Sequence, residues 1–373
     1  MKTKGIGVYI HVPFCLRKCN YCDFCSYPDK TDAQKREYVS AVCREILSYK
    51  KEPKLCVDTV FFGGGTPTLL NDADFSRIFD TLGEAFDILA DAEITVEANP
   101  KTVTEKSARH LYSLGVNRIS IGAQSIHNKE LSALGRMHDF DGFREAYGIF
   151  SRVGFKNISV DLMYGIPHQS KESFKETLSY VASLSPSHIS VYGLIIEEGT
   201  PFFEQRDSLL LPSENDEADM YELAHKILTD NGYLHYEISN YAKDGYHSRH
   251  NKKYWRCEEY IGIGVSAHSY YDGIRYSNPE SISEYLSKTG AQYLTQSTPT
   301  REDAAFEYAM LGLRLSEGIS LAEYECRLGA PLDLNRGELK PYFDGGYITK
   351  DGDRLSLTYK GFYISNTILT ELL

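Results

Sequence analysis

The 373-residue chain has few cysteines, a deficit of positive charge and no long apolar run, and each shortage excludes a class of protein. Its eight cysteines are too sparse for a disulfide-stapled fold. The chain has 40 Lys and Arg and 52 Asp and Glu, which gives a net charge of −12. This negative charge disfavours general nucleic-acid binding. No apolar run approaches the roughly 20 residues that a membrane-spanning helix needs. What is left is the composition of a large globular protein.

The N-terminal stretch MKTKGIGVYIHVPFC carries two lysines, but its apolar part is short and lacks a small-residue cleavage site. We interpret it as a first β-strand and not as a signal peptide. We therefore expect a cytoplasmic protein, in a reducing compartment where clustered thiols do not form disulfides.

Short apolar or β-branched runs alternate with amphipathic helical patterns through the first part of the chain. This alternation predicts a parallel α/β sheet, either an incomplete barrel or an open, curved sheet. Polar or glycine-rich signatures follow each run, and chemistry in such folds gathers at the carboxyl ends of the strands. We therefore expect one site at that edge. The runs are residues 7–12, 57–62, 93–98, 117–122, 157–163 and 188–195.

The pattern changes after residue 234, where aromatic residues and His become frequent and periodicity is weak. We interpret this segment as a connection that completes the core. From residue 301 a helical region leads to two short strands around an Asp-Gly turn, which resembles a winged-helix module. That module has 8 Lys or Arg and 12 Asp or Glu, a net of −4, which disfavours DNA binding. We predict three parts: residues 1–234, 235–300 and 301–373.

Four cysteines cluster in HVPFCLRKCNYCDFCSY, residues 11–27. Cys15, Cys19 and Cys22 have the spacing C-x3-C-x2-C, and Cys25 follows. A zinc site usually takes two short cysteine pairs separated by a longer loop, and no second pair is present here. Three thiols in such a run can hold three irons of a [4Fe–4S] cube and leave one iron open. This spacing favours an iron–sulfur cluster, with zinc or structural thiols as the alternative.

Polar residues after the later runs add candidate ligand contacts. The glycine run GGGTPT, residues 63–68, can offer backbone groups to an amino-acid head, or it is a tight strand-to-helix connection. Glu97 can accept ribose hydroxyls, or it is a capping or loop acid. Gln124 supplies a side-chain amide, and Arg136 supplies a guanidinium that can pair with a carboxylate. Asp161 lies within an apolar strand and needs a polar partner, so we expect a ligand contact there.

Taken together, these segments resemble a known family. In order along the chain, they are similar to the oxygen-independent coproporphyrinogen III oxidase-like radical S-adenosylmethionine (SAM) proteins, and within them to the HemW-type heme chaperones. The resemblance runs from about residue 5 to the C-terminus. It implies an α/β fold with a partial (β/α)6 barrel and a C-terminal helical, winged-helix-like domain. The segments are YIHVPFCLRKCNYCDF, FFGGGTPTLL, VEANP, GVNRISIGAQS, LGRMHD, VDLMYGIP, YEISNYA, HNKKYW and YIGIGVSAHSY.

The resemblance also implies roles for individual residues. It implies a [4Fe–4S] cluster on Cys15, Cys19 and Cys22, with SAM chelating the open iron. Contacts with this SAM fall on Tyr9, Gly64, Gly65, Thr66 and Glu97. The positions of Gln124, Arg136 and Asp161 contact a second SAM in the oxidase branch. The HNKKYW segment is associated with heme, which makes His250 a candidate heme residue; the alternative is a packed aromatic segment with a hydrogen-bonded His250.

Two departures separate the chain from the oxidase branch. Phe24 stands where the oxidases have a fourth cysteine, and only fourteen residues precede Cys15. We expect Cys25 not to bind the cluster and the Phe24 ring to pack under the loop.

We therefore predict a heme chaperone that carries heme as cargo to heme-accepting apo-proteins, with no membrane span and at most transient membrane association. The alternative is an oxygen-independent coproporphyrinogen III oxidase, which decarboxylates porphyrinogen propionates through a 5′-deoxyadenosyl radical. Retention of heme and the lack of decarboxylation would distinguish the chaperone from the enzyme.

Overall fold

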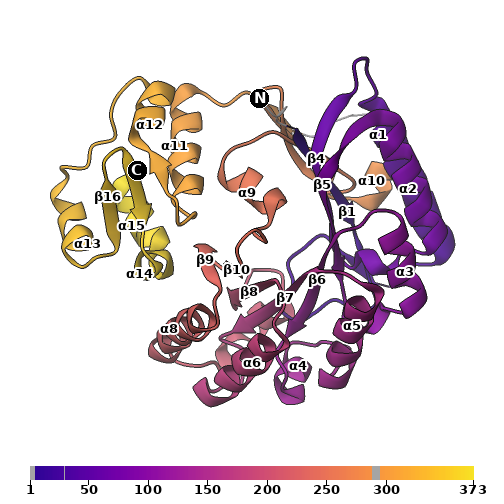
Figure 1. Ribbon diagram of the computed structural model, residues 1–373, viewed down its shortest axis with the longest axis horizontal. Helices are drawn as coiled ribbons and strands as arrows, with labels where there is room; N and C mark the ends of the chain where they lie inside the picture. The colour runs from indigo at the N-terminus through magenta and orange to yellow at the C-terminus, as the bar shows by residue number, and fades with distance from the viewer. Residues whose placement is uncertain (1–4, 29, 288–294) are drawn as a thin grey trace.

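Figure 1 shows the computed structural model, which describes residues 5–28, 30–287 and 295–373. Residues 1–4, 29 and 288–294, which belong to the predicted segments 1–234 and 235–300, lie outside the described residues. The alternating runs form the strands β1 (Ile6–Val12), β4 (Leu55–Gly64), β5 (Phe86–Ala98), β6 (Arg118–Gln124), β7 (Asn157–Tyr164) and β8 (His188–Gly193). The later strands are β9 (Leu234–Glu237), β10 (Asn240–Ala242), β11 (Tyr260–Ile263), β12 (His268–Tyr271), β13 (Ile274–Ser277) and β14 (Thr295–Ser297).

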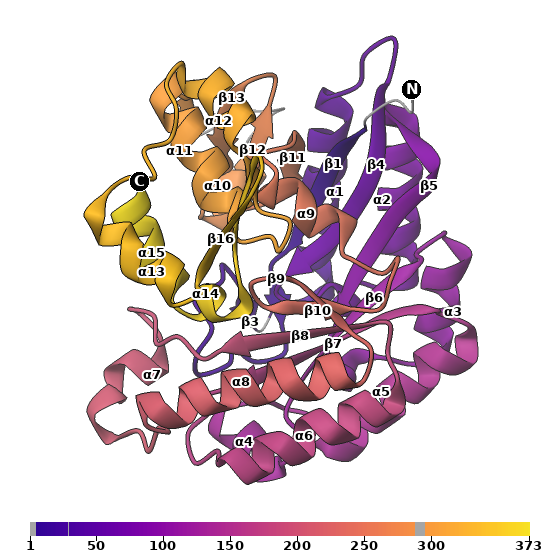
Figure 2. The ribbon, with the colours of Figure 1, turned by 60° about the vertical axis from the view of Figure 1, so that its left-hand side comes forward.

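These strands form one sheet in the order β14-β13-β12-β11-β1-β4-β5-β6-β7-β8-β10-β9. The strands from β1 to β8 are parallel to one another, so the predicted parallel α/β architecture is confirmed. In the described part of the chain no ladder joins β14 to β9, and the sheet curves as an open partial barrel (Figure 2). β11 was not predicted, because its segment lacks clear periodicity, yet it pairs in parallel with β1.

Helices cover the outer face of the curved sheet (Figures 1 and 2). Several begin at capping boxes, such as those of Thr31 and Ser170, which satisfy free backbone N–H groups at the helix start. Gly154 ends one helix in a left-handed conformation, as a C-cap glycine does. The outer helices are α1 (Asp32–Ser48), α2 (Asp72–Ala85), α3 (Glu105–Ser113), α5 (Phe140–Val153), α6 (Lys171–Leu184) and α8 (Glu214–Asp230), with the shorter α4 (Asn128–Ala133) and α7 (Pro201–Glu204) in loops.

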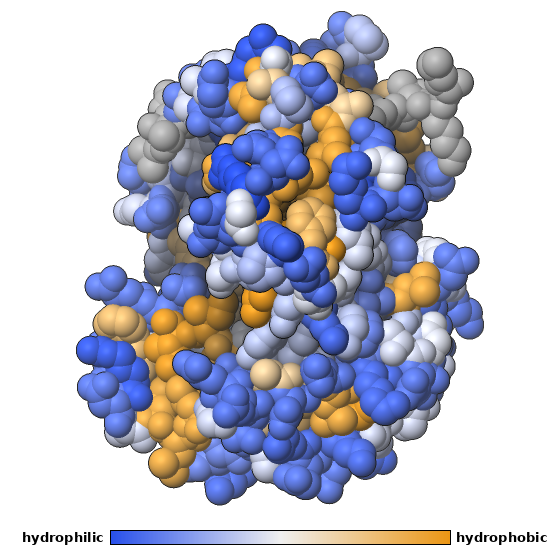
Figure 3. Space-filling model, turned by 90° about the vertical axis from the view of Figure 1, so that its left-hand side faces the viewer, coloured by the Kyte–Doolittle hydropathy of each residue, from blue (hydrophilic) through white to orange (hydrophobic). Residues whose placement is uncertain are grey.

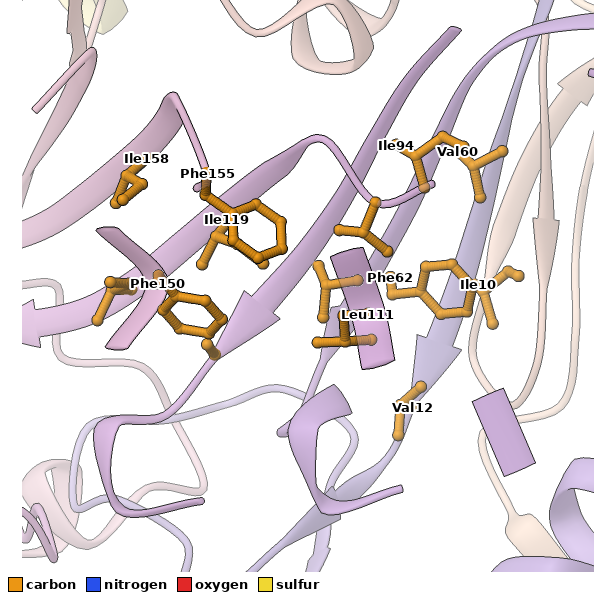
Figure 4. Close-up of a cluster of buried hydrophobic side chains, with 14 of the residues drawn as sticks. Ile10, Val12, Val60, Phe62, Ile94, Leu111, Ile119, Phe150, Phe155 and Ile158 are labelled. Carbon is orange, nitrogen blue, oxygen red and sulfur yellow. The ribbon is translucent and has the colours of Figure 1, made fainter. Parts of the chain in front are cut away.

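The main hydrophobic core lies between the sheet and these helices. Ile10 and Phe62 from β1 and β4 face the same layer as Leu111 and Phe150 from α3 and α5 (Figure 4). Burying each such side chain stabilises the fold by about 1.5–3 kcal/mol. Because side chains alternate along a strand, the residues between these apolar ones face the inner side of the sheet. That inner side is where polar residues collect.

The C-terminal part has its own core, built mainly from residues 305–372. The two predicted short strands, β16 (Ile348–Asp351) and β17 (Arg354–Leu357), pair with each other, and β17 also pairs with the additional strand β15 (Ile319–Ser320). A backbone bridge between Glu237 and Leu315 connects this part to β9. The boundaries at residues 234 and 300 stay a prediction. The helices here are α11 (Arg301–Gly312), α12 (Leu321–Leu328), α13 (Lys340–Asp344), α14 (Tyr359–Tyr363) and α15 (Ser365–Leu372), and α9 (Arg249–Trp255) and α10 (Ile282–Ser287) precede them.

The surface is largely hydrophilic, with apolar residues gathered in patches on the face that Figure 3 shows. Large apolar side chains exposed in the described part of the chain include Ile195 and Leu210, at 67% and 66% of their surface. Within the same described residues, no helix combines the length and apolar character needed to cross a membrane.

Candidate functional site

A cavity of about 340 Å³ lies on the inner side of the sheet and gathers most of the predicted site residues. Tyr9 instead lines a neighbouring cavity of about 410 Å³, which shares Phe24, Gly64 and Glu97 with the first. His250 lines neither cavity. The predicted residues in the first cavity are Cys15, Cys19, Cys22, Gly64, Gly65, Thr66, Glu97, Gln124, Arg136 and Asp161.

The three predicted cysteine ligands lie in a loop that the rest of the chain holds in place. The backbone N–H of Asn20 donates to the Leu134 carbonyl at 3.0 Å, and its side-chain amide donates to the Ala133 carbonyl at 2.9 Å. From the other side, the Phe202 N–H donates to the Asn20 carbonyl at 3.0 Å. These contacts with other parts of the chain therefore shape the loop.

The chemistry of the three thiols fits an iron–sulfur cluster. Burial raises the pKa of the Cys15 thiol and raises that of Cys22 to about 11, so metal binding would release their protons. Cys15, Cys19 and Cys22 all line the first cavity. Thiolates are the ligands of iron–sulfur clusters, and each thiol of a cube binds a different iron, so this donor set fits a cluster.

The glycine turn after β4 packs directly against the strand that leads into the cysteine loop. Gly64 has φ +106°, and a Cβ there would lie 2.4 Å from the His11 ring. A Cβ on Gly65 would lie 2.6 Å from the Phe14 carbonyl oxygen. Thr66 follows, with Oγ1 3.8 Å from the Cys15 sulfur. The glycines therefore make the tight connection, and Gly64, Gly65 and Thr66 also line the cavity. A contact of their backbone groups with an amino-acid head stays a prediction.

Two carboxyl groups face the same cavity and influence each other. Glu97 accepts a hydrogen bond from the Gly64 N–H at 3.2 Å, and burial together with the charge of Asp161 raises the pKa of Glu97 to about 8. Asp161 accepts hydrogen bonds from Ser120, Ser159 and Ser190 at 2.9, 3.2 and 2.7 Å. Burial nevertheless raises the pKa of Asp161. The polar partners that this strand carboxylate requires are serines, so its burial alone does not require a ligand.

Gln124 and Arg136 lie where the cysteine loop meets the end of β6. The β6–β7 register shifts between Gly122 and Gln124, and Gln124 has φ +66°, a strained value for a non-glycine residue. Arg136 donates to the Gly122 carbonyl at 2.8 Å and to the Cys19 sulfur at 3.6 Å. The guanidinium therefore connects the strand end to one predicted cluster ligand.

The side chain of Cys25 is directed away from the other three cysteines. Its thiol donates to the Glu280 carbonyl at 3.4 Å and lines the neighbouring cavity, which supports the expectation that it is no cluster ligand. Phe24 is 61% exposed at the wall between the two cavities, so the prediction that its ring packs under the loop is wrong. Tyr21, and not Phe24, is the aromatic residue of this loop that packs against the hydrophobic cluster containing Leu134.

His250 is a core residue with both ring nitrogens engaged. Nδ1 is hydrogen-bonded to the Thr59 hydroxyl at 2.9 Å and Nε2 to the Tyr254 hydroxyl at 2.8 Å. The ring stacks on Phe61 and is 1% exposed, and burial lowers its pKa to about 3. This arrangement favours the structural interpretation of His250 over a direct bond to heme iron.

Several residues that the sequence interpretation missed also line the first cavity. They share one signal, since they are polar residues at every second position of apolar strand runs, where the side chains face the inner side of the sheet. They are Arg118 and Ser120 on β6, and Ser190 and Tyr192 on β8; Asn251 joins them from α9.

Comparisons with known proteins show which family the chain and its fold are similar to. Residues 9–181 match the Radical SAM superfamily, and residues 300–364 match the HemN C-terminal domain. The chain is 33% identical to the heme chaperone HemW of Lactococcus lactis subsp. lactis, covering 100% of this chain and 98% of that protein. It is 35% identical to HemW of Escherichia coli, and the alignment covers 99% of this chain and 98% of that protein. Among solved structures, the coproporphyrinogen III oxidase HemN from Escherichia coli has a TM-score of 0.84 at 25% identity, covering 99% of this chain and 90% of that one.

Proposed function

The chain belongs to the HemW family of radical SAM proteins, and on that premise we propose that Cys15, Cys19 and Cys22 hold a [4Fe–4S] cluster. When bound and reduced, such a cluster supplies an electron for chemistry on SAM. The observation that carries the proposal is the convergence of these thiols, the Gly64–Thr66 turn and Glu97 on one cavity. The turn offers backbone groups to the amino-acid head of SAM, and Glu97 offers a carboxyl group to its ribose hydroxyls.

Anaerobic reconstitution tests the cluster. The chain should take up about four irons, and Cys15→Ala, Cys19→Ala and Cys22→Ala should each abolish the broad visible absorption. Cys43→Ala and Cys326→Ala are matched controls, because one thiol is buried in the main core and the other is exposed away from the cavity. Stoichiometric zinc in place of iron would contradict the assignment.

We further propose that the chain carries heme, because its relatives are named heme chaperones. The second candidate is coproporphyrinogen III oxidase activity, which the full-length likeness to HemN favours. Phe24 in place of a fourth cysteine supports the chaperone. Protein supplied with reductant and SAM should bind heme and convert no coproporphyrinogen III. Robust decarboxylation would instead support the enzyme.

Heme-accepting apo-proteins are the partners that this function requires, and any membrane association is transient. A reducing cytoplasm is the compartment that suits a chain whose eight cysteines are all free. Transfer is tested by mixing heme-loaded chain with a heme-free acceptor and following the heme spectrum. Heme that stays on the chain with every acceptor would contradict delivery.

A further inference from the structure

Arg118 is a buried cation that lines the cavity. It is the first residue of β6 and only 2% of its surface is exposed. Ser120, Gly122 and Gln124 follow on the same face of the strand and line the same cavity. The cavity therefore extends along the inner face of β6 from its start to its end.

The guanidinium of Arg118 has an unpaired donor, because its Nε is buried without a hydrogen bond. Burial raises the pKa values of Asp161 and Glu97, and the charge of Arg118 opposes that rise, so both carboxyl groups lie within its electrostatic range. The carboxylate of Asp161 is occupied by serine hydroxyls, and Glu97 accepts from the Gly64 N–H. A buried donor without an acceptor costs free energy, so the contacts within the fold leave part of Arg118 unsatisfied.

The nearby histidines are neutral and do not balance the charge of Arg118. His188 is hydrogen-bonded to Ser159 at 2.8 Å and to the Tyr236 hydroxyl at 2.9 Å. Burial and the charge of Arg118 lower the pKa of His188, which therefore stays neutral. His250 is likewise neutral, with both ring nitrogens engaged. The unpaired Nε–H of Arg118 is thus available to a ligand in the cavity.

The position of Arg118 indicates which part of a ligand it meets. Gly122, whose carbonyl binds Arg136 beside Cys19, lies four residues further along β6. At the rise of a β-strand this is about 13 Å from Arg118. A SAM chelated at the cysteine loop has its own carboxylate at that loop. An anion that reaches Arg118 therefore belongs to a group held deeper in the cavity.

We propose that Arg118 binds a carboxylate of a ligand that occupies the cavity beyond the cysteine loop. A guanidinium matches a carboxylate geometrically, because two parallel N–H donors meet two oxygens. The ligand's identity rests on the proposed function, which offers two sources of this chemistry. One is a propionate of the heme cargo, and the other is the methionine carboxylate of a further SAM molecule.

A small probe tests the carboxylate site without cluster, SAM or heme. Sodium propionate, compared with sodium chloride at equal ionic strength, should raise the melting temperature of the wild-type chain more than that of Arg118→Gln. Arg118→Lys, which keeps the charge but not the two-pronged geometry, should respond in between and guards against misfolding of the Gln variant. Arg275→Gln, whose arginine pairs with Glu307, is the control and should respond as the wild type does. Equal propionate responses in the wild type and Arg118→Gln would overturn the proposal.

Matched ligands then identify the source of the carboxylate. Wild-type chain should bind heme about tenfold more tightly than heme dimethyl ester, and Arg118→Gln should lose this preference if the carboxylate is a propionate. If Arg118→Gln instead loses the preference of the wild-type chain for SAM over decarboxylated SAM, the carboxylate belongs to SAM. Both preferences retained in Arg118→Gln would overturn the proposal. If the wild type binds neither heme nor SAM, the proposed function fails, while the propionate measurement still decides the role of Arg118.

Discussion

Replacing His250 distinguishes a structural residue from a heme ligand. His250→Ala removes a fully buried ring and leaves a cavity, which costs about 2–3 kcal/mol by analogy with other large-to-small core substitutions. The hydroxyls of Thr59 and Tyr254 also lose their partner, at about 1 kcal/mol each. We therefore expect the free energy of unfolding to fall by about 4 kcal/mol. His250→Gln keeps a donor and an acceptor at the site and should cost about 1–2 kcal/mol.

Urea denaturation near pH 7.5 measures these losses, and heme titration of the same variants measures ligation. Tyr254→Phe is the matched control, because it removes only the hydroxyl that partners Nε2 and should cost about 1 kcal/mol. Folded His250→Gln should bind heme with the wild-type visible spectrum. A variant with wild-type stability that binds heme with an altered ligand-field spectrum would refute this reasoning and identify His250 as a ligand of the iron.

Three further predictions concern the cavity. The pKa of Glu97 is about 8 in the folded chain against an ordinary 4.5, so the folded state holds a proton that the unfolded state releases. The free energy of unfolding of the ligand-free chain should therefore fall by about 3–4 kcal/mol between pH 5 and 8, and this fall should be smaller in Glu97→Gln. Urea denaturation at a series of pH values measures it, and a fall of equal size in both proteins would contradict the prediction. Cys25→Ser should keep the full iron content and the SAM-dependent change in the cluster spectrum, and loss of iron would make Cys25 a ligand. Gly65→Ala should weaken SAM binding at least tenfold, because its Cβ meets the Phe14 carbonyl at 2.6 Å. Gly83→Ala, whose Cβ has open space, should leave binding unchanged, and equal affinities in the two variants would remove the argument for the tight turn.

The local features of this protein were determined by the sequence itself. Apolar runs separated by helical patterns predicted the six consecutive parallel strands, because backbone hydrogen bonding and side-chain alternation act over a few residues. The C-x3-C-x2-C spacing and the glycine run are local features too, because each is made of residues that lie close together in the sequence. Their placement after strand ends was enough to predict one shared site, and the cavity contains Cys15, Gly64 and Glu97 together.

Features that depend on distant partners were decided only by the tertiary structure. The hydroxyls that hold Asp161 come from strands on either side of it, with Ser120 and Ser190 separated from it by 41 and 29 residues. β11 joins the sheet beside β1, although about 250 residues separate them, because the buried edge of β1 needs hydrogen-bond partners. His250 meets Thr59 across 191 residues, and the Nε of Arg118 is buried without a hydrogen-bond partner. Whether a polar side chain is satisfied by the fold or left free for a ligand depends on such long-range contacts, which residue spacing along the chain does not encode.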